Sequence, residues 1–377
     1  MIEMLVGPPE FDEVLSPARR VDPAGLRQEV ALGGAEREQL EVVDPTAGAG
    51  WDSMVEDFGN ASVFHRSGWA QVLQRTYGHK PYYVRRSEGE RDRALVPLME
   101  VRSLFTGRRG VCVPFADTCD ALNGTRGLFA AVCELGRSCG WKHIELRGGS
   151  IIPREAPHSA SYLQHWLDLS DGTEKVAARF APSVRRALRK AKANGLTVET
   201  GDSAELMRSY YRLHVLTRRR HGLPPQPWSF FENQHRYLVE RGHGFVVIAK
   251  ARNRAVAGAV YYHTAKQALY KFGAADAAFS SVRPSNLVMA EGIRHLIENE
   301  FQTLHFGRTS ESNRGLARYK RGWGAIEDTL HYYRYDLRGE RWVASSPEGR
   351  AESSKLFRYM PLMVNRFLGK LLYPHLD

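Results

Sequence analysis

Residues 184–195, VRRALRKAKANG, hold the densest group of cations in the sequence, and no acidic residue separates them. With 3.6 residues per helical turn, these cations would form two neighbouring stripes: Arg185, Arg189 and Lys192 on one, Arg186 and Lys190 on the other. A solvated helix face normally mixes charges of both signs, because adjacent like charges repel. The segment therefore predicts a helix that binds an anion, such as the phosphates of a nucleotide or of RNA. A helix whose cations are merely solvated is the alternative.

A second stretch, QTLHFGRTSESNRGLARYKRGWG (302–324), places a glycine directly after an apolar run and follows it with small residues, cations and aromatics. It could be an anion-binding loop, a nucleic-acid contact or only a connection between two strands. Its glycines do not have the spacing of a nucleotide phosphate loop. We expect a strand that ends at Phe306 and Gly307, a polar connection, and a helical turn that carries Tyr319 and Lys320.

Several familiar catalytic motifs are missing from the sequence. It contains no G-x-S-x-G, no H-E-x-x-H, no G-x-x-x-x-G-K-[ST], and no G-x-G-x-x-G after a predicted strand. A nucleophilic triad, a zinc protease or a P-loop enzyme is therefore not expected. Chemistry that depends on positioning and charge stabilisation remains, and transfer of an activated acyl group to an amine fits it.

Length, composition and charge limit the number of domains, the partners and the location that we expect. The chain has 377 residues, 43% of them apolar and 10% aromatic, which is typical of a folded protein of two domains or of two similar halves. Its formal net charge of +11 favours polyanionic partners such as RNA, nucleotide phosphates or an anionic membrane surface. The N-terminus lacks the pattern of an export signal and no apolar run is long enough to span a membrane. We therefore expect a cytoplasmic protein, with association at a membrane surface as an open alternative. The cysteines lack zinc-site spacing, and no metal is expected; they are Cys112, Cys119, Cys133 and Cys139.

The same order of predicted helices and strands occurs twice along the chain. Residues 39–160 and 161–337 each predict helices, a meander of strands, a further helix and a strand, which indicates a duplicated α/β unit with mixed, mostly antiparallel sheets flanked by helices. In the second unit, the helical segment before Gly195 should break at Pro182. Residues 1–38 are predicted to be a loosely ordered leader.

Residues 338–377 form a basic, amphipathic C-terminal tail. Within 354–376, apolar residues alternate with cations around Pro361. A pair of short helices packed on the body is one interpretation, and a surface that touches anionic lipid or a partner is the other.

Four segments together resemble one family: SVRRALRKAKANGL, RPSNLVMAEGIRH, LHFGRTSESNRGLARYKRGWGA and LHYYRYDL. Their order and spacing resemble the Fem-type (FemABX-like) peptidyltransferases, which build peptidoglycan cross-bridges, and related GNAT-like acyltransferases. The resemblance is clearest over residues 170–337 and extends more weakly over most of the chain after residue 40. It implies two GNAT-like units side by side, the first on the acceptor side and the second on the donor side.

The resemblance also implies roles for residues of this sequence. GLARYKRGWG is similar to a family stretch by which Tyr319 and Lys320 would sit at the acyl ester, with Lys320 contacting a terminal phosphate or the tetrahedral oxyanion. A surface lysine beside Trp323 is the alternative. The donor's phosphates are assigned to the cationic helix and to two arginines of the second stretch; these residues are Arg185, Arg186, Arg189, Lys190, Arg308 and Arg318.

The sequence departs from the family in three places. His305 stands where an Asp often precedes the Phe-Gly pair, which makes it a possible acid or base or merely an inward strand residue. No long helical-hairpin arm fits between residues 196 and 242, and no pyrophosphate loop of the acetyl-CoA type is visible, which favours a donor other than CoA. On the acceptor side, Asp117 and Arg147 could line a cleft, although each could equally be a turn or surface residue.

The function predicted from the sequence is transfer of an aminoacyl group from aminoacyl-tRNA to an amine or hydroxyl of a small molecule or cell-envelope precursor. An acyl-CoA-dependent N-acyltransferase of a polysaccharide or natural-product pathway is the alternative within enzymes. A non-catalytic protein that binds RNA or membrane is the alternative of another class. No resident cofactor is expected, since either donor is a co-substrate.

Overall fold

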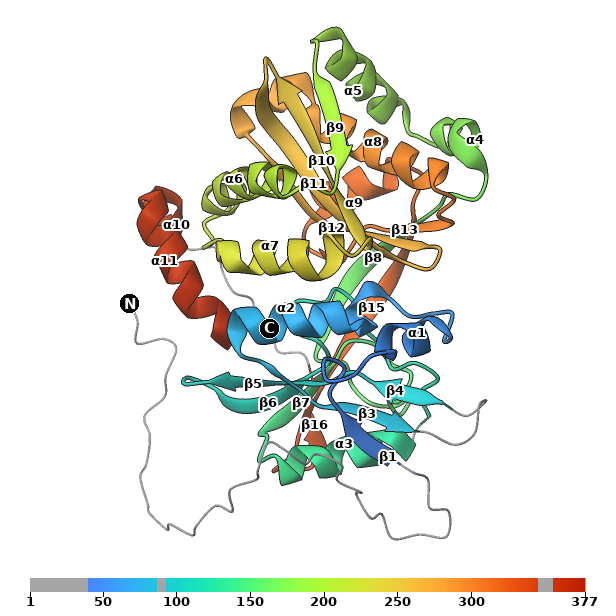
Figure 1. The fold of residues 1–377 in the computed structure, drawn as a ribbon, viewed down its shortest axis with the longest axis vertical. Coiled ribbons are helices and arrows are strands. Elements are labelled where there is room, and N and C mark those ends of the chain that lie inside the picture. The colour runs from blue at the N-terminus through green and yellow to red at the C-terminus, as the bar shows by residue number, and fades with distance from the viewer. Residues whose placement is uncertain (1–39, 87–92, 126, 345–354, 377) are drawn as a thin grey trace.

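The computed structural model of the protein describes residues 40–86, 93–125, 127–344 and 355–376 (Figure 1). The leader predicted for residues 1–38 lies outside the described residues. Figure 1 shows the two halves of the chain stacked along the long axis, with helices α2 (Ser67–Tyr77) and α7 (Trp228–Gln234) in contact where they meet.

The first half combines strands with three helices. Its strands are β1 (Leu40–Val43), β2 (Lys80–Pro81), β3 (Tyr83–Arg86), β4 (Ala94–Val96), β5 (Met99–Ser103), β6 (Gly107–Val111) and β7 (His143–Leu146). Besides α2, its helical elements are α1 (Trp51–Glu56), α3 (Gly127–Ser138) and the 3-10 turn η2 (Val63–His65).

The second half and the tail contain the remaining elements. The strands are β8 (Ala160–Asp168), β9 (Thr197–Gly201), β10 (Gly244–Ala251), β11 (Arg254–Thr264), β12 (Gln267–Ala275), β13 (Thr303–His305), β14 (Thr309–Ser310), β15 (Ile326–Asp336) and β16 (Arg341–Trp342). Besides α7, the helices are α4 (Gly172–Ala178), α5 (Pro182–Ala193), α6 (Ala204–Arg220), α8 (Pro284–Glu298), α9 (Arg314–Arg321), α10 (Lys355–Tyr359) and α11 (Leu362–Leu372). Shorter turns are the π-helical η3 (His235–Val239) and the 3-10 turns η4 (Ala277–Val282) and η6 (Tyr373–His375).

Local sequence signals account for many helix ends. Pro182 opens α5, and the positive φ of +67° at Gly195 follows its end, so the expected break and stop are confirmed. Ser203 caps α6 by accepting a hydrogen bond from the backbone of Leu206. Pro284 opens α8 in the same way as Pro182 opens α5. These helices therefore begin and end where their caps place them.

Strand β6 is shorter than its sequence pattern favours. The run RGVCVPF (109–115) has the composition of one strand, but β6 ends at Val111. Val113 and Phe115 adopt positive φ angles of 47° and 61°, which β-strands do not contain. The chain therefore turns after β6 and forms a loop, residues 112–117, between the two halves.

The two halves share one continuous sheet. Strand order in this sheet is β2-β5-β6-β7-β15-β8-β13-β12-β11-β10-β9, and β1, β3 and β4 form a separate small sheet. Residues 326–332 of β15 pair with β8, whereas residues 333–336 pair with β7 of the first half. The predicted boundary at residues 160 and 161 coincides with the start of β8 and stays a prediction, because β15 belongs to both halves by its pairing.

Two parallel strands of this sheet diverge. β12 and β13 pair in parallel from Gln267 and Thr303 to Leu269 and His305. β13 ends there, while β12 continues to Ala275 along β11. Beyond this last pair, β11 is the only strand that pairs with β12 among the described residues.

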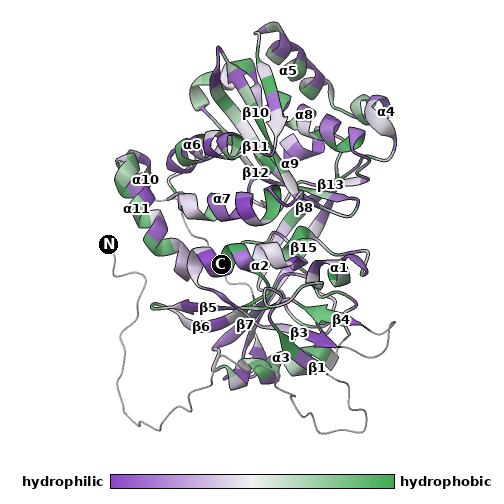
Figure 2. Cartoon of the chain, viewed as in Figure 1, coloured by the Kyte–Doolittle hydropathy of each residue, from purple (hydrophilic) through white to green (hydrophobic). Residues whose placement is uncertain are grey.

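Apolar side chains form two cores on opposite faces of strands β9–β12. Helices α6 and α7 cover one face, and their core continues into the first half through α2. Helices α5 and α8 cover the other face with a smaller core. Figure 2 shows apolar residues in the strands between these helices. The sheet and its helices thus form a rigid frame around the point where β12 and β13 diverge.

Candidate active site

Helix α9 carries Lys320 into the interior. Asn313 caps this helix by accepting a hydrogen bond from the backbone of Leu316. Three residues past Lys320, the side chain of Trp323 is fully buried and packs edge-to-face on Phe180, which holds the end of α9 against the body. Lys320 is only 3% exposed, so the alternative of a surface lysine is wrong.

The ammonium of Lys320 lies at the end of β13. Its Nζ donates hydrogen bonds to the carbonyl oxygens of Gly307 at 2.8 Å and Arg308 at 3.4 Å. An ammonium has three protons, so these two bonds leave one for another acceptor. The predicted arrangement of a strand end, a polar connection and a helical turn is present, because β13 is followed by the short β14 and then by α9.

Gly307 allows a carboxylate of the first half to approach this strand end. Its φ is +69°, and a Cβ atom at this position would lie 3.4 Å from the carboxyl carbon of Asp117. A side chain here would be strained by the positive φ, while its Cβ would lie at ordinary contact distance from Asp117. The glycine that ends the apolar run therefore suits the backbone conformation found where Asp117 reaches this strand end.

Asp117 pairs with Lys271, a residue of β12 that the sequence analysis missed. The Nζ of Lys271 donates to the Asp117 carboxylate at 2.8 Å and to the Phe115 carbonyl at 2.6 Å. The side chains are only 6% and 13% exposed. Lys271 lies beyond Leu269, where β12 has diverged from β13. A lysine within the otherwise apolar and aromatic run ALYKFGA was the one local signal, and it belongs to no motif.

Arg147 fixes the loop that presents Asp117. This loop contains the positive φ angles of Val113 and Phe115, a conformation that persists only when its surroundings hold it. The guanidinium of Arg147 donates to the carbonyls of Val113 at 3.1 Å and Ala116 at 2.8 Å, and it pairs with Glu145. Arg147 is 1% exposed, so this placement favours a positioning role over direct contact with an acceptor.

Burial and neighbouring charges set the pKa values of these groups. Burial lowers the pKa of Lys320 to about 8, and Lys271 adds to this shift while Asp117 opposes it. Burial also outweighs Asp117 and lowers the pKa of Lys271. For Asp117, burial disfavours the charged carboxylate, but Lys271 and Arg308 outweigh burial and hold its pKa below the ordinary value. The cluster thus contains a buried carboxylate and two buried amines, and Lys320 stays mostly protonated at neutral pH with a pKa of about 8.

His305 and Arg308 belong to the same neighbourhood. His305 is 3% exposed and its ring lies 4.2 Å from that of Trp166. Burial lowers its pKa to about 3, so the imidazole is neutral at pH 7 and only a weak proton acceptor. The guanidinium of Arg308 lies over the rings of Tyr162 and Tyr332, at 4.7 and 5.2 Å from their centroids. The structure therefore brings together Lys320 and His305, predicted as catalytic, Arg308, predicted to bind the donor, and Asp117, predicted on the acceptor side. It adds Lys271, and the roles of all these residues stay predictions.

Tyr319 and the cationic helix lie on the other side of α9. The Tyr319 hydroxyl donates to the Ser285 carbonyl in the first turn of α8 at 3.3 Å. Helix α5 abuts the end of α9, since the backbone of Ala181 donates to the Gly322 carbonyl at 2.8 Å. The predicted phosphate-binding cations of α5 and α9 are exposed; they are Arg185, Arg186, Arg189, Lys190 and Arg318.

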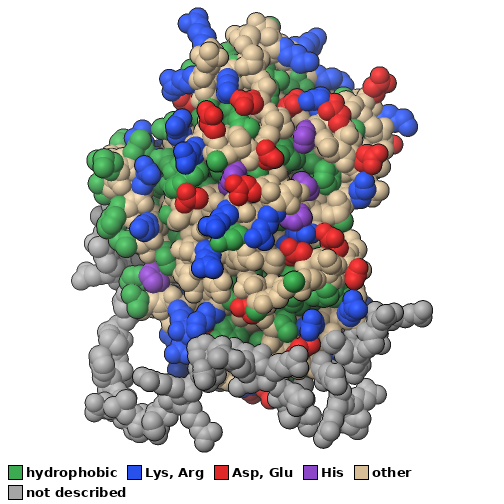
Figure 3. Space-filling view, viewed as in Figure 1, with side chains coloured by type: hydrophobic (Ala, Val, Ile, Leu, Met, Phe, Trp, Pro, Cys, Tyr) green, Lys and Arg blue, Asp and Glu red, His purple; other side chains and the backbone are tan. Residues whose placement is uncertain are grey.

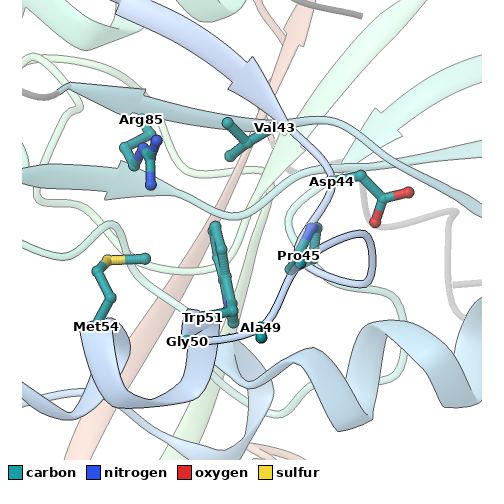
Figure 4. A pocket seen from close by; sticks show the side chains of 9 residues that line it. Val43, Asp44, Pro45, Ala49, Gly50, Trp51, Met54 and Arg85 are labelled. Carbon is teal, nitrogen blue, oxygen red and sulfur yellow. The ribbon is translucent and has the colours of Figure 1, made fainter. Parts of the chain in front are cut away.

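Two cavities lie in the described part of the chain, and neither is lined by Lys320, Asp117 or Lys271. One cavity of about 290 Å³ lies in the first half beside Trp51, Met54 and Arg85, as Figure 4 shows. Another, of about 390 Å³, lies between α11 and the start of α7. Among the described residues, no group of three or more His, Cys, Asp or Glu side chains could hold a metal ion.

A comparison with known protein families identifies the domain that contains Lys320. Residues 178–321, from α4 to α9, match the family described as acetyltransferase (GNAT) domain. The second half contains a GNAT domain. The ends of β12 and β13 and the Lys320 cluster lie within or against this GNAT domain, and the presence of the domain makes the chain an acyltransferase. No curated protein matches the sequence.

Solved structures show the same fold over most of the chain. FemX is 13% identical, with a TM-score of 0.57, over 74% of this chain and 95% of its own. A conserved protein of unknown function from Bacteroides thetaiotaomicron is 10% identical, with a TM-score of 0.50, over 78% of this chain and 98% of its own. Together with the matched domain, the likeness to FemX and to the Bacteroides protein confirms the predicted mixed α/β, GNAT-like fold.

Proposed function

We propose that this GNAT-type acyltransferase moves an aminoacyl group from aminoacyl-tRNA to an amine or hydroxyl of a small molecule or cell-envelope precursor. The acceptor's nitrogen or oxygen attacks the ester carbonyl and forms the new amide or ester bond. The bond from the carbonyl carbon to the terminal ribose oxygen breaks, and that oxygen takes the proton that the acceptor loses. Atoms and charge balance without a metal or redox partner.

The observation that carries this proposal is the buried ammonium of Lys320. Two carbonyls fix it, one proton is left over, and water is largely excluded from it. A preorganised cation in such a site stabilises negative charge that develops on the ester oxygen, typically by about 10²–10³-fold in rate for one donor. Lys320 remains a donor throughout and forms no covalent bond.

The cationic helix supports a polyanionic donor. The exposed cations of α5 form an unbroken basic face, and the start of α5 touches the end of α9, which carries Lys320. A nucleic acid bound along α5 would therefore lie next to the helix that carries Lys320. The sequence resemblance to Fem-type transferases favours the same donor.

An acyl-CoA donor is the second candidate, because the matched family is described as an acetyltransferase domain. The segment between β12 and α8, where such enzymes bind pyrophosphate, ends here in Arg283, Pro284 and Ser285. Arg283 has a positive φ of 60° and α8 begins immediately after it. A helix N-terminus at this place can bind an anion through its backbone amides.

Donor competition separates the two candidates. The purified chain is incubated with a small-amine and lipid-precursor fraction and with either radiolabelled aminoacyl-tRNA or radiolabelled acetyl-CoA. We expect label transfer from aminoacyl-tRNA, abolished by RNase treatment before incubation and by Lys320→Ala. Lys266→Ala, an exposed lysine on a turn, is the matched control and should transfer normally. Transfer from acetyl-CoA alone would overturn the tRNA donor. An unchanged rate in Lys320→Ala would overturn the role of this cluster.

A further inference from the structure

Helix α11 presents an apolar stripe to the solvent. Met363, Phe367 and Leu371 are 83%, 60% and 52% exposed, and their spacing of four residues aligns them along one face. Arg366 and Lys370 are exposed on the adjacent face. An exposed apolar stripe beside cations is the pattern of a helix that lies in a membrane interface.

The orientation of α11 is fixed by its opposite face. Gly369 is buried there, and a Cβ atom on it would lie 2.0 Å from the Pro225 carbonyl oxygen. Beyond the helix, the buried Tyr373 donates to the Pro224 carbonyl at 3.1 Å and accepts from Arg218 at 2.7 Å. The helix therefore cannot rotate to bury its apolar stripe without losing these contacts.

A second apolar projection lies beside the end of this helix. Leu104 and Phe105, at the tip of the β5–β6 hairpin, are 90% and 72% exposed. The Phe105 ring contacts the His375 ring at 5.3 Å, and Arg109 donates to the His375 carbonyl at 2.9 Å. Figure 1 shows the hairpin pointing to the side on which α10 and α11 lie. Two elements far apart in sequence thus expose apolar side chains along one edge of the molecule.

The charged residues of the C-terminal helices on this edge are all positive. The segment 355–376, which contains α10 and α11, has cations but no acidic residue. Figure 3 shows apolar and cationic side chains next to one another along the edge where α10 and α11 lie. The cavity of about 390 Å³ opens here, between Trp228 on one side and Phe367, Arg366 and Lys370 on the other. An aromatic and apolar wall with two cations suits an amphiphile whose polar end is negative.

We propose that this edge, made of α11 and the β5–β6 tip, docks the protein on the surface of an anionic lipid bilayer. Met363, Phe367, Leu371, Leu104 and Phe105 would enter the interface between headgroups and acyl chains, while Arg366 and Lys370 contact the lipid phosphates. Among the described residues, no helix is long and apolar enough to cross a membrane, which agrees with a peripheral contact. The contact is separate from the donor and acceptor chemistry proposed above.

Vesicle sedimentation tests the proposal with the full chain. Wild type is expected to sediment with vesicles of phosphatidylglycerol and phosphatidylcholine, and about tenfold less with pure phosphatidylcholine. Replacing both Met363 and Phe367 with Ser should weaken sedimentation by about tenfold, since apolar burial supplies most of the partitioning. Leu104→Ser combined with Phe105→Ser should weaken it by severalfold. Arg366→Gln with Lys370→Gln should remove the preference for anionic vesicles.

A matched control separates a specific surface from general stickiness. Ile326→Ser removes an apolar side chain of 72% exposure from β15 and should leave sedimentation unchanged. Thermal unfolding of each variant within a few degrees of wild type confirms that it is folded. Absence of sedimentation of wild type with anionic vesicles would overturn the proposal. So would a concentration-dependent dimer that Phe367→Ser abolishes, because the stripe would then serve a second copy of the chain.

Discussion

Helix α5 and the Lys320 cluster use the same residue types in opposite environments. The cations of α5 are exposed, and its longest basic run has no acidic neighbour in sequence. Lys320 and Lys271 are buried, lie close to Asp117, and have lowered pKa values. Exposed cations act over a distance and are screened by salt, whereas a buried cation acts on one atom and depends on its neighbours. The two regions should therefore respond differently to mutation, pH and salt.

The largest effect should follow removal of the buried carboxylate that pairs with Lys271. Asp117→Asn leaves the ammonium of Lys271 buried without its counter-charge, which typically costs about 3–5 kcal/mol of stability. Thermal and urea unfolding of wild type and variant measure this loss of stability. Asp171→Asn is the control, because Asp171 pairs at the surface with Lys175 and Arg179 and should change stability by under about 1 kcal/mol. Equal effects of the two substitutions would contradict the distinction between the buried and exposed charges.

Lys320→Met should lower transfer by about 10²–10³-fold while leaving donor binding nearly unchanged, because it removes one preorganised donor to the oxyanion. Folding at neutral pH works against the buried ammonium, whose pKa falls to about 8. Methionine is uncharged and similar in size, but it cannot donate to the Gly307 and Arg308 carbonyls. The loss of these hydrogen bonds offsets the relief of the buried charge, so the unfolding temperature should change by only a few degrees. Rates measured together with unfolding temperatures check both parts. A variant that loses activity only because it unfolds would remove Lys320 from the proposed chemistry.

The pH profile should distinguish two roles for Lys320. Because its pKa is lowered to about 8, Lys320 is mostly protonated below that pH and loses its proton as the pH rises through it. If the charge stabilises the oxyanion, the rate falls above pH 8 by up to about tenfold per unit. Lys320→Arg keeps its charge at these pH values and should not show this fall. A rate that rises through pH 8 in wild type alone would instead identify the neutral amine as a base.

The smallest effects should come from α5. Arg185→Gln and Arg189→Gln, made singly, should each weaken tRNA binding by a few fold and lower the salt dependence of binding by about one unit of slope. Transfer at saturating donor should be unchanged, since neither residue touches the buried cluster. Lys250→Gln, a cation already paired with Glu199, is the control. Fluorescence anisotropy with tRNA at several salt concentrations measures the slope. No change in slope would place the nucleic acid elsewhere.

The sequence alone determined those features of this protein that depend on residues near one another in the chain. Periodicity, Pro182, Ser203 and Pro284 set the helix ends, because helix caps act within a few residues. The basic face of α5 also followed from helical spacing, and the order of motifs led to the GNAT-like fold.

Only the tertiary structure decided the cluster itself. Asp117 and Lys271 are 154 residues apart in sequence, and the turn of the chain at Val113 and Phe115 brings them together. The sequence predicted Asp117 but not Lys271, since a lone lysine in a strand has no local signal of its partner. It also gave no sign that β15 would pair with both halves. Pairing across the chain depends on where the strands meet in space, and short-range patterns do not encode that.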